Sequence, residues 1–249
     1  MQDRASLGTS GRLFTLGALP GGASAGPSLG EGSATRRTPG RALSRLAAAW
    51  LAVCASAALA APDARILAAA QQEQAAYLDT LRALVGIESG SKDVEGVRAM
   101  AKLVAKQLGA LGGEVQLIEH TDITRMDDTP EHVGPAVQAV FKGRGKARIL
   151  MIAHMDTVYP RGMLQDQPFR IDGDRAYGLG IADDKQGVAL IIHNVALLKK
   201  LGVQDFGTLT VLLNGDEEIS SPGSRQLITR VAADQDAVLS FEGGGEHGA

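Results

Sequence analysis

The sequence predicts an α/β protein with a mixed, mostly parallel sheet and helices on both faces. A dense apolar run at residues 149–153 is typical of a buried strand of a parallel sheet. From that run onward, apolar strands alternate with amphipathic helices, which indicates right-handed parallel crossovers. Polar and acidic residues directly follow the apolar strands, and open α/β sheets bind ligands where their strands end.

Two amphipathic helices are expected before the sheet begins. Residues 63–85 contain strong helix formers and place their apolar side chains on one helical stripe. Residues 92–111 repeat this pattern, and the glycines at 112–113 close the helix. The Ser-Gly-Ser segment 89–91 separates the two helices.

The remaining elements form one domain within residues 61–249, with no internal repeat. Alternating apolar and polar residues predict strands at 114–119 and 136–141, joined by a polar loop at 121–134. The stretch 147–158 contains the central strand, and a hairpin turn is expected at 172–174 after a short strand at 169–171. The series then continues with a helix at 185–201, a strand at 207–213, a helix at 222–233 and a strand at 237–242.

The first 60 residues differ in composition from the rest. Residues 1–35 are rich in Gly, Ser, Ala and Pro, and we expect them to be disordered or to lie upstream of the true start. Residues 36–60 combine a basic stretch, an apolar run and an A-x-A site, which predicts a secretory signal peptide. The alternatives are an uncleaved amphipathic helix and a twin-arginine signal. Export predicts a periplasmic or secreted protein with no membrane attachment after cleavage.

Charge and cysteine content exclude several classes of site. Residues 61–249 contain 19 basic and 26 acidic residues, so we expect no nucleic-acid partner. The only cysteine, Cys54, falls inside the predicted signal peptide. A disulfide framework and a cysteine-based zinc site are therefore excluded, and any metal must be held by His, Asp and Glu.

Candidate metal ligands occur at four separate strand ends. His154 ends the central strand, and Asp156, two residues later, is placed to fix its tautomer. The other ends carry Asp183, the pair at 217–218, and Glu242. Ligands that converge in this way suit zinc, and a neighbouring free Glu suits a general base.

Each candidate also has a simpler interpretation. His154 could be a hydrogen-bonded structural residue, and Asp183 could cap the helix that follows it. The Glu pair at 217–218 could belong to a solvated loop. Gly178 and Gly180 could belong to a dinucleotide loop, but the third glycine of that motif is absent. The conjunction of four strand ends favours the metal site.

These segments resemble the aminoacylase/glutamate carboxypeptidase family of zinc metallopeptidases, and within it the bacterial glutamate carboxypeptidases. The resemblance covers roughly residues 70–243 and depends on the segments 154–159, 176–185, 214–218 and 239–242. It implies a zinc-exopeptidase-like catalytic domain and two zinc ions. His154, Asp183 and Glu242 would bind the first ion, while Asp183 and Glu218 would bind the second.

The resemblance also implies the catalytic roles and the substrates. Asp156 would orient His154, and Glu217 would be the general base that activates water. The bond between Asp183 and Asp184 would be a cis peptide. The substrate would be a small peptide, a folyl-glutamate or an N-acyl amino acid, cleaved at the amide next to a C-terminal residue that we expect to be glutamate.

The sequence departs from the family after Glu242. The family's dimerisation domain, and the later His that completes the second zinc site, are not found before Ala249. We therefore expect an incomplete catalytic domain with one complete zinc site, an exposed apolar sheet edge, and a homodimer only in a full-length version. The alternatives are a truncated, inactive metal-binding fragment and a doubly wound nucleotide-binding module.

Overall fold

The computed structural model describes residues 4–6 and 63–244. The chain divides into two compact units, residues 1–8 with 68–249, and residues 9–67. The second unit is described only at residues 63–67, where helix α2 begins. The predicted signal peptide at 36–60 lies outside the described residues, as does nearly all of the segment 1–35.

Five strands form the main sheet, in the order β2-β3-β7-β4-β8. β4 is parallel to both β7 and β8, whereas β3 is antiparallel to its two neighbours. Four strands therefore run in one direction and β3 runs in the other, which confirms a mixed sheet. The strands are β2 (Glu114–Ile118), β3 (Ala136–Lys142), β4 (Arg148–His154), β7 (Thr208–Asn214) and β8 (Ala237–Ser240).

A second, three-stranded sheet has the order β1-β6-β5. β5 (Arg170–Asp172) and β6 (Arg175–Tyr177) form the predicted hairpin, and Gly173 adopts the positive φ of 62° that its turn requires. β1 (Arg4–Ser6) pairs antiparallel with β6. This strand falls inside the segment 1–35, for which the sequence predicted disorder or a position upstream of the true start.

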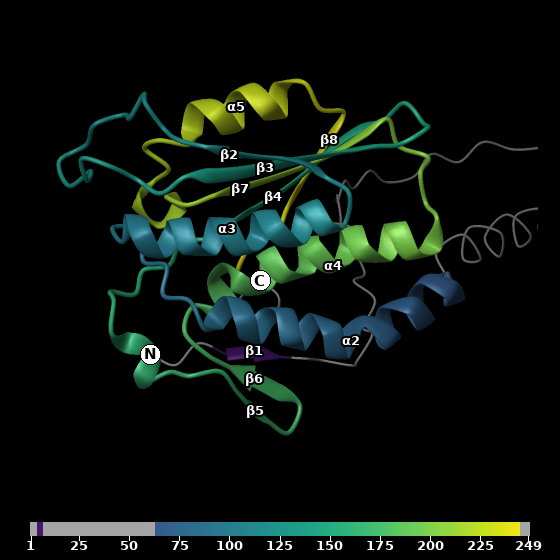
Figure 1. Cartoon of the computed structure of the whole chain (residues 1–249), viewed down its shortest axis with the longest axis horizontal. Coiled ribbons are helices and arrows are strands. Elements are labelled where there is room, and N and C mark those ends of the chain that lie inside the picture. Colours follow the sequence, from purple (N-terminus) through teal and green to yellow (C-terminus); the bar gives the residue numbers. More distant parts are fainter. Residues whose placement is uncertain (1–3, 7–62, 245–249) are drawn as a thin grey trace, which may run out of the picture. The chain divides into compact units, whose positions relative to one another are not determined.

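Helices cover both faces of the main sheet, as predicted (Figure 1). α5 lies on one face, and α3 and α4 lie on the other, with α2 packed beyond them (Figure 1). The two faces have separate apolar clusters. The larger joins α2, α3 and α4 to the sheet, and the smaller packs Leu227 of α5 against Leu150 and Leu212 of the sheet. The helices are α2 (Ala64–Val85), α3 (Val94–Ala110), α4 (Gln186–Leu201) and α5 (Arg225–Ala233).

Three short helical turns occupy the loops: η1 (Met163–Gln165), η2 (Ile181–Lys185) and η3 (Glu217–Ile219). η2 leads directly into α4, and η3 follows β7. Two of the three turns thus carry residues predicted for the metal site. Apolar periodicity does not predict these turns, because their conformation depends on how each loop folds.

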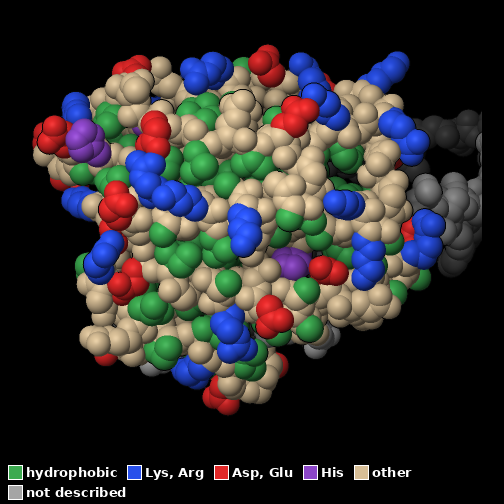
Figure 2. Space-filling view, in the orientation of Figure 1, with side chains coloured by type: hydrophobic (Ala, Val, Ile, Leu, Met, Phe, Trp, Pro, Cys, Tyr) green, Lys and Arg blue, Asp and Glu red, His purple; other side chains and the backbone are tan. Residues whose placement is uncertain are grey.

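The edge of the main sheet agrees with one further expectation. Edge strand β8 exposes Val238 and Leu239 to 48% and 47%, which confirms the predicted apolar edge. Acidic and basic side chains are interspersed on the face shown in Figure 2. Within the described residues, no helix is both long enough and apolar enough to cross a membrane.

Candidate metal centre

The sheet order brings the predicted strand ends together. His154 ends β4 and is paired in register with Asn214 at the end of β7. On the other side of β4, Ile152 is paired with Ser240, so Glu242 lies just beyond the end of β8. Because β7, β4 and β8 run parallel, their carboxyl ends share one edge of the sheet. Segments far apart in the sequence therefore meet there.

Three of the six predicted site residues form a compact group. His154, Asp183 and Glu242 each offer one ligand atom, and these atoms all lie within 4.8 Å of one another. His154 Nε2 lies 3.0 Å from Asp183 Oδ1 and 3.5 Å from Glu242 Oε1. No other set of three or more His, Cys, Asp or Glu residues meets this criterion in the part of the chain that the structure describes. The group could hold a metal ion.

His154 is buried and its ring is held in a defined orientation. Nδ1 lies 3.1 Å from the backbone oxygen of Asp156 and 3.4 Å from its Oδ1. Nε2 is therefore the nitrogen that faces Asp183 and Glu242. Burial lowers the pKa of His154, but the carboxylates of Asp156, Asp184 and Glu242 outweigh it and raise that pKa to about 10. The imidazole thus lies in a strongly negative environment that also suits a cation.

The Asp156 carboxylate connects this ring to the end of β7. It is fully buried and accepts hydrogen bonds from the backbone N–H groups of Glu217 and Glu218, both at 3.1 Å. The hydroxyl of Ser91 donates a further bond of 2.7 Å to Oδ2. Asp156 therefore fixes His154 and the turn that carries the two glutamates at the same time.

Asp183 reaches the group from the turn that precedes α4. Its bond to Asp184 is a cis peptide, as the family resemblance implied. Asp184, rather than Asp183, accepts a bond from a backbone N–H of the first helical turn, that of Gly187 at 3.2 Å. The capping alternative therefore applies to Asp184, and the Asp183 side chain, half exposed, points toward His154. Burial raises the pKa of Asp184 to about 8.

Glu217 and Glu218 lie outside the group of three but belong to the same electrostatic environment. Partial burial raises the pKa of both side chains, that of Glu218 to about 7, and the charge of Asp183 adds to this effect. Partial burial likewise raises the pKa of Asp183, with Glu242 adding to it. Carboxylates that repel one another in this way are stabilised by a shared cation. His, Asp and Glu are also zinc ligands, so the residues fit a divalent metal.

Asp216 is a site residue to which sequence reasoning gave no role. It is fully buried and its carboxylate accepts bonds from the backbone N–H groups of Gly223 and Ser224, at 2.7 and 3.0 Å, and from the Ser224 hydroxyl. These bonds close the loop between β7 and α5 that presents Glu217 and Glu218. A signal was available, because an acid two residues after an apolar strand is costly to bury without partners.

Replacing Asp216 with Asn is expected to lower the free energy of unfolding by roughly 2–4 kcal/mol, because buried donors lose a charged acceptor. Urea denaturation followed by circular dichroism would measure the change. The matched control is Asp122→Asn on the exposed loop, which should stay within about 0.5 kcal/mol of the unmodified chain. Equal stability of the two variants would contradict the role given to Asp216.

Removing the Ser91 hydroxyl tests whether its hydrogen bond to Asp156 helps to hold the metal ligands in position. Ser91→Ala should weaken zinc binding about tenfold, at the lower end of the roughly 10–100-fold that partners behind metal ligands commonly contribute, because Ser91 acts through Asp156. Competition with a chromophoric chelator would measure the dissociation constant. Ser89→Ala is the control, because Ser89 is also buried and donates a 2.8 Å bond to the Met155 carbonyl without contacting Asp156. Both variants should lose stability, but only Ser91→Ala should lose metal affinity.

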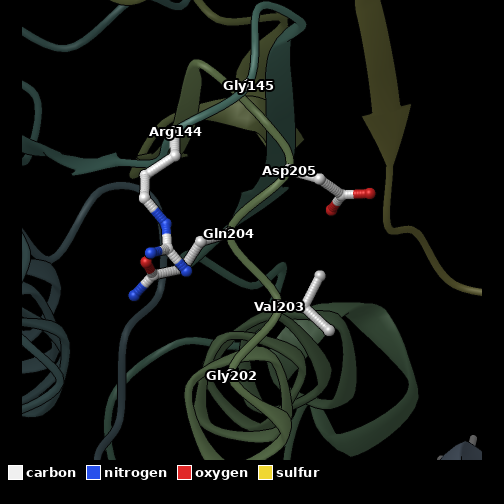
Figure 3. Close-up of a pocket in the computed structure, with 6 residues that line it drawn as sticks. All are labelled: Arg144, Gly145, Gly202, Val203, Gln204 and Asp205. Carbon is white, nitrogen blue, oxygen red and sulfur yellow. The ribbon is translucent and has the colours of Figure 1, made fainter.

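Two surface pockets help to separate this site from others. One pocket of about 460 Å³ is lined by Arg144, Gly145 and residues 202–205 (Figure 3). These residues precede β4 and β7, so the pocket lies at the opposite end of those strands from His154. A second pocket, of about 520 Å³, is lined by Glu218 and therefore adjoins the metal centre.

Comparison with known proteins agrees with this geometry. Residues 150–249 match Peptidase family M20/M25/M40. Over these residues the chain is similar to M20 peptidases. Carboxypeptidase G2 of Pseudomonas sp. (strain RS-16) is 47% identical over 180 residues, which cover 72% of this chain and 41% of that protein. Succinyl-diaminopimelate desuccinylase of Gluconobacter oxydans is 40% identical over 78 residues, 30% of this chain and 20% of that protein.

Solved structures support the M20 fold at lower sequence identity. An M20 family metallo-carboxypeptidase of Sulfolobus solfataricus superposes with a TM-score of 0.56 at 21% identity, covering 69% of this chain and 38% of that one. The Saccharomyces cerevisiae dipeptidase Dug1p gives a TM-score of 0.58 at 20% identity, covering 71% and 40%. This chain thus spans about two fifths of the length of carboxypeptidase G2 and of these structures.

Proposed function

We propose that this chain is part of a zinc-dependent M20 carboxypeptidase or amidohydrolase that cleaves the amide bond next to a C-terminal amino acid. The observation that carries the proposal is the convergence of His154, Asp183 and Glu242 within 4.8 Å. Glu217 and Glu218, which are held by Asp156, lie beside that group. A nucleotide-binding module would account for the sheet but not for this group of residues.

His154, Asp183 and Glu242 would hold one zinc ion, and Glu218 would hold a second together with Asp183. When bound, zinc polarises a carbonyl group and lowers the pKa of water toward about 7. Of the residues present, these four offer imidazole and carboxylate atoms, which are among the ligands that zinc binds. The raised pKa values of Asp183 and Glu218 support this role, because a nearby cation would stabilise their charged forms.

Glu217 would move the proton that hydrolysis requires. Its carboxylate would accept a proton from the attacking water, whose oxygen bonds to the scissile carbonyl carbon. The same proton would then pass to the leaving nitrogen as the C–N bond breaks. Partial burial and neighbouring acids raise the pKa of Glu217, which brings it closer to the range that favours transfer in both directions near neutral pH. The bond from its own N–H to Asp156 would hold it in place.

For the substrate, we propose a compound in which an amide bond joins an acyl group to a C-terminal glutamate, such as a folyl-glutamate. N-acyl amino acids and small peptides are related candidates. This choice is supported by the overall resemblance to glutamate carboxypeptidases and by the 47% identity to carboxypeptidase G2. Export to the periplasm or the medium is part of the proposal and depends on the signal-like composition of residues 36–60.

The second candidate is a protein that binds metal without hydrolysing amides. It is favoured by the position of Glu218, which lies outside the group of three ligands. Under this candidate the first ion binds as described, while the second lacks enough ligands among the described residues. The two candidates differ in turnover and agree in metal content.

Both candidates are tested by loading the 249-residue chain with zinc, removing the excess and measuring metal content together with amide hydrolysis. We expect about one tightly bound zinc ion per chain, given one site with three protein ligands. We also expect release of glutamate from a folyl-glutamate and from an N-acyl-glutamate. Zinc without turnover would favour the second candidate, and the absence of bound zinc would contradict both.

A further inference from the structure

A pocket of about 520 Å³ lies beside the metal centre, and none of the roles described above uses it. Three segments line it, namely 90–93, 157–161 and 218–219. Its volume is within the range of about 300–1,000 Å³ that is typical of small-molecule sites. Glu218 belongs to its wall, so a molecule in the pocket would extend directly away from the reacting atoms.

The base of the pocket is rigidly built. Gly90 and Thr157 form an isolated parallel bridge, with Ser91 N–H donating to the Thr157 carbonyl at 3.1 Å and Thr157 N–H donating to the Ser89 carbonyl at 2.9 Å. A Cβ atom at Gly90 would lie 2.3 Å from the Tyr159 carbonyl oxygen, so this close approach requires glycine. The backbone that holds Asp156 therefore also forms the pocket before any ligand binds.

The wall offers apolar contact. Val158 is 64% exposed, although valine is usually buried, and Pro160 and Ile219 also line the pocket. An extended aliphatic chain, or a flat ring, would cover this surface. Such contact would bind the arm of a substrate without providing selectivity for charge.

Two cations, Lys92 and Arg161, line the pocket, and they differ in how strongly they are paired. Arg161 is neutralised by Asp93, which accepts its Nε and Nη2 groups at 2.9 and 2.6 Å. Lys92 is 60% exposed, and its Nζ lies 3.6 Å from Asp128, itself 77% exposed, so that pair is weak. Lys92 is thus the cation that is available to a bound molecule.

We propose that this pocket is a substrate subsite that selects an arm with an apolar stem ending in a carboxylate, which Lys92 binds. The inference depends on the proposed amide hydrolysis, because it assigns the pocket to one arm of that substrate. Arg161 is a positioning residue here: through Asp93, whose Oδ1 accepts the N–H of Gly96, it ties the loop 157–162 to the start of α3. A variant of Arg161 would disturb this loop, whereas Lys92→Gln changes only an exposed side chain.

Three compounds of matched shape test the proposal. N-pentanoyl-L-norvaline is the reference, N-glutaryl-L-norvaline adds a carboxylate to the acyl arm, and N-pentanoyl-L-glutamate adds one to the amino-acid side chain. Binding to the zinc-loaded 249-residue chain would be measured by isothermal titration calorimetry, for the unmodified protein and for Lys92→Gln. Lys106→Gln, an exposed lysine on α3 outside the pocket, is the matched control.

We expect one of the two charged compounds to bind more tightly than the reference. Lys92→Gln should weaken the binding of that compound about three- to fivefold, as expected for an exposed ion pair. The affinity for the reference compound should stay unchanged. The charged compound that responds identifies which arm enters the pocket. Because salt screens exposed charges, the difference should shrink as ionic strength rises.

Equal binding of all three compounds would overturn the proposal, as would equal effects of Lys92→Gln and Lys106→Gln or no binding at all. Chromatography of the recovered compounds would show whether they were hydrolysed, which tests the proposed function separately from the subsite. A Lys92-dependent preference without hydrolysis would support the subsite and reject the peptidase role. Hydrolysis without a charge preference would support the peptidase role and reject the subsite.

Discussion

Replacing Glu217 with Gln is expected to reduce amide hydrolysis by roughly 10²–10⁴-fold while leaving the zinc content unchanged. The amide of Gln keeps the shape of the side chain but cannot accept the proton of the attacking water. Glu217 lies outside the group of three ligands, so the first metal ion should still bind. Glutamate release from the N-acyl substrate and metal analysis of the same sample would measure both quantities.

The matched control for this prediction is Glu131→Gln. Glu131 is 86% exposed, and its nearest described charged partner is His132 at 3.9 Å, so the substitution should change neither property. If Glu217→Gln retained full hydrolysis, the proposed proton transfer would be rejected. Loss of zinc together with activity would instead make Glu217 a metal ligand.

Replacing His154 with Ala should produce the largest loss of metal affinity. This substitution removes the only imidazole of the group and leaves Asp183 and Glu242, both about half exposed, to repel each other. Partners behind metal ligands commonly contribute 10–100-fold to affinity, so we expect the loss of a direct ligand to exceed about 100-fold. Chelator competition would give the dissociation constants.

His132→Ala provides the comparison for His154→Ala. His132 is 77% exposed and distant in sequence from every strand end of the site, so its removal should leave zinc affinity unchanged. Circular dichroism would show whether each variant remains folded. Unchanged zinc binding by a folded His154→Ala variant would exclude His154 from the site.

Much of the fold followed from local patterns in the sequence. Apolar periodicity predicted α2, α3, α4 and the strands of the main sheet. The helices and the strands β3, β4 and β7 bury apolar side chains, whereas β8 is exposed along its length. The reversed direction of β3 was not predicted, since alternation alone does not determine which neighbours a strand takes. β1 was missed because three residues carry too little pattern to indicate a strand.

The candidate site was predictable where a polar or charged residue follows the apolar residues of a strand. His154 and Glu242 follow apolar runs, and parallel strands must end at one edge, so their proximity followed from the topology. The Ser91–Asp156 bond was not predictable, because it joins residues 65 apart through a loop. The same holds for Asp216, whose partners Gly223 and Ser224 only become neighbours when the loop after β7 folds back.

The central claim is that His154, Asp183 and Glu242 share one metal ion, and anomalous diffraction from zinc-soaked crystals of the 249-residue chain tests it most directly. Data collected on both sides of the zinc absorption edge would locate the ion independently of any assay. The account predicts a strong difference peak at about 2.0–2.2 Å from His154 Nε2 and from one oxygen each of Asp183 and Glu242. Clear density for the three side chains with no peak between them, or with zinc bound elsewhere, would contradict it.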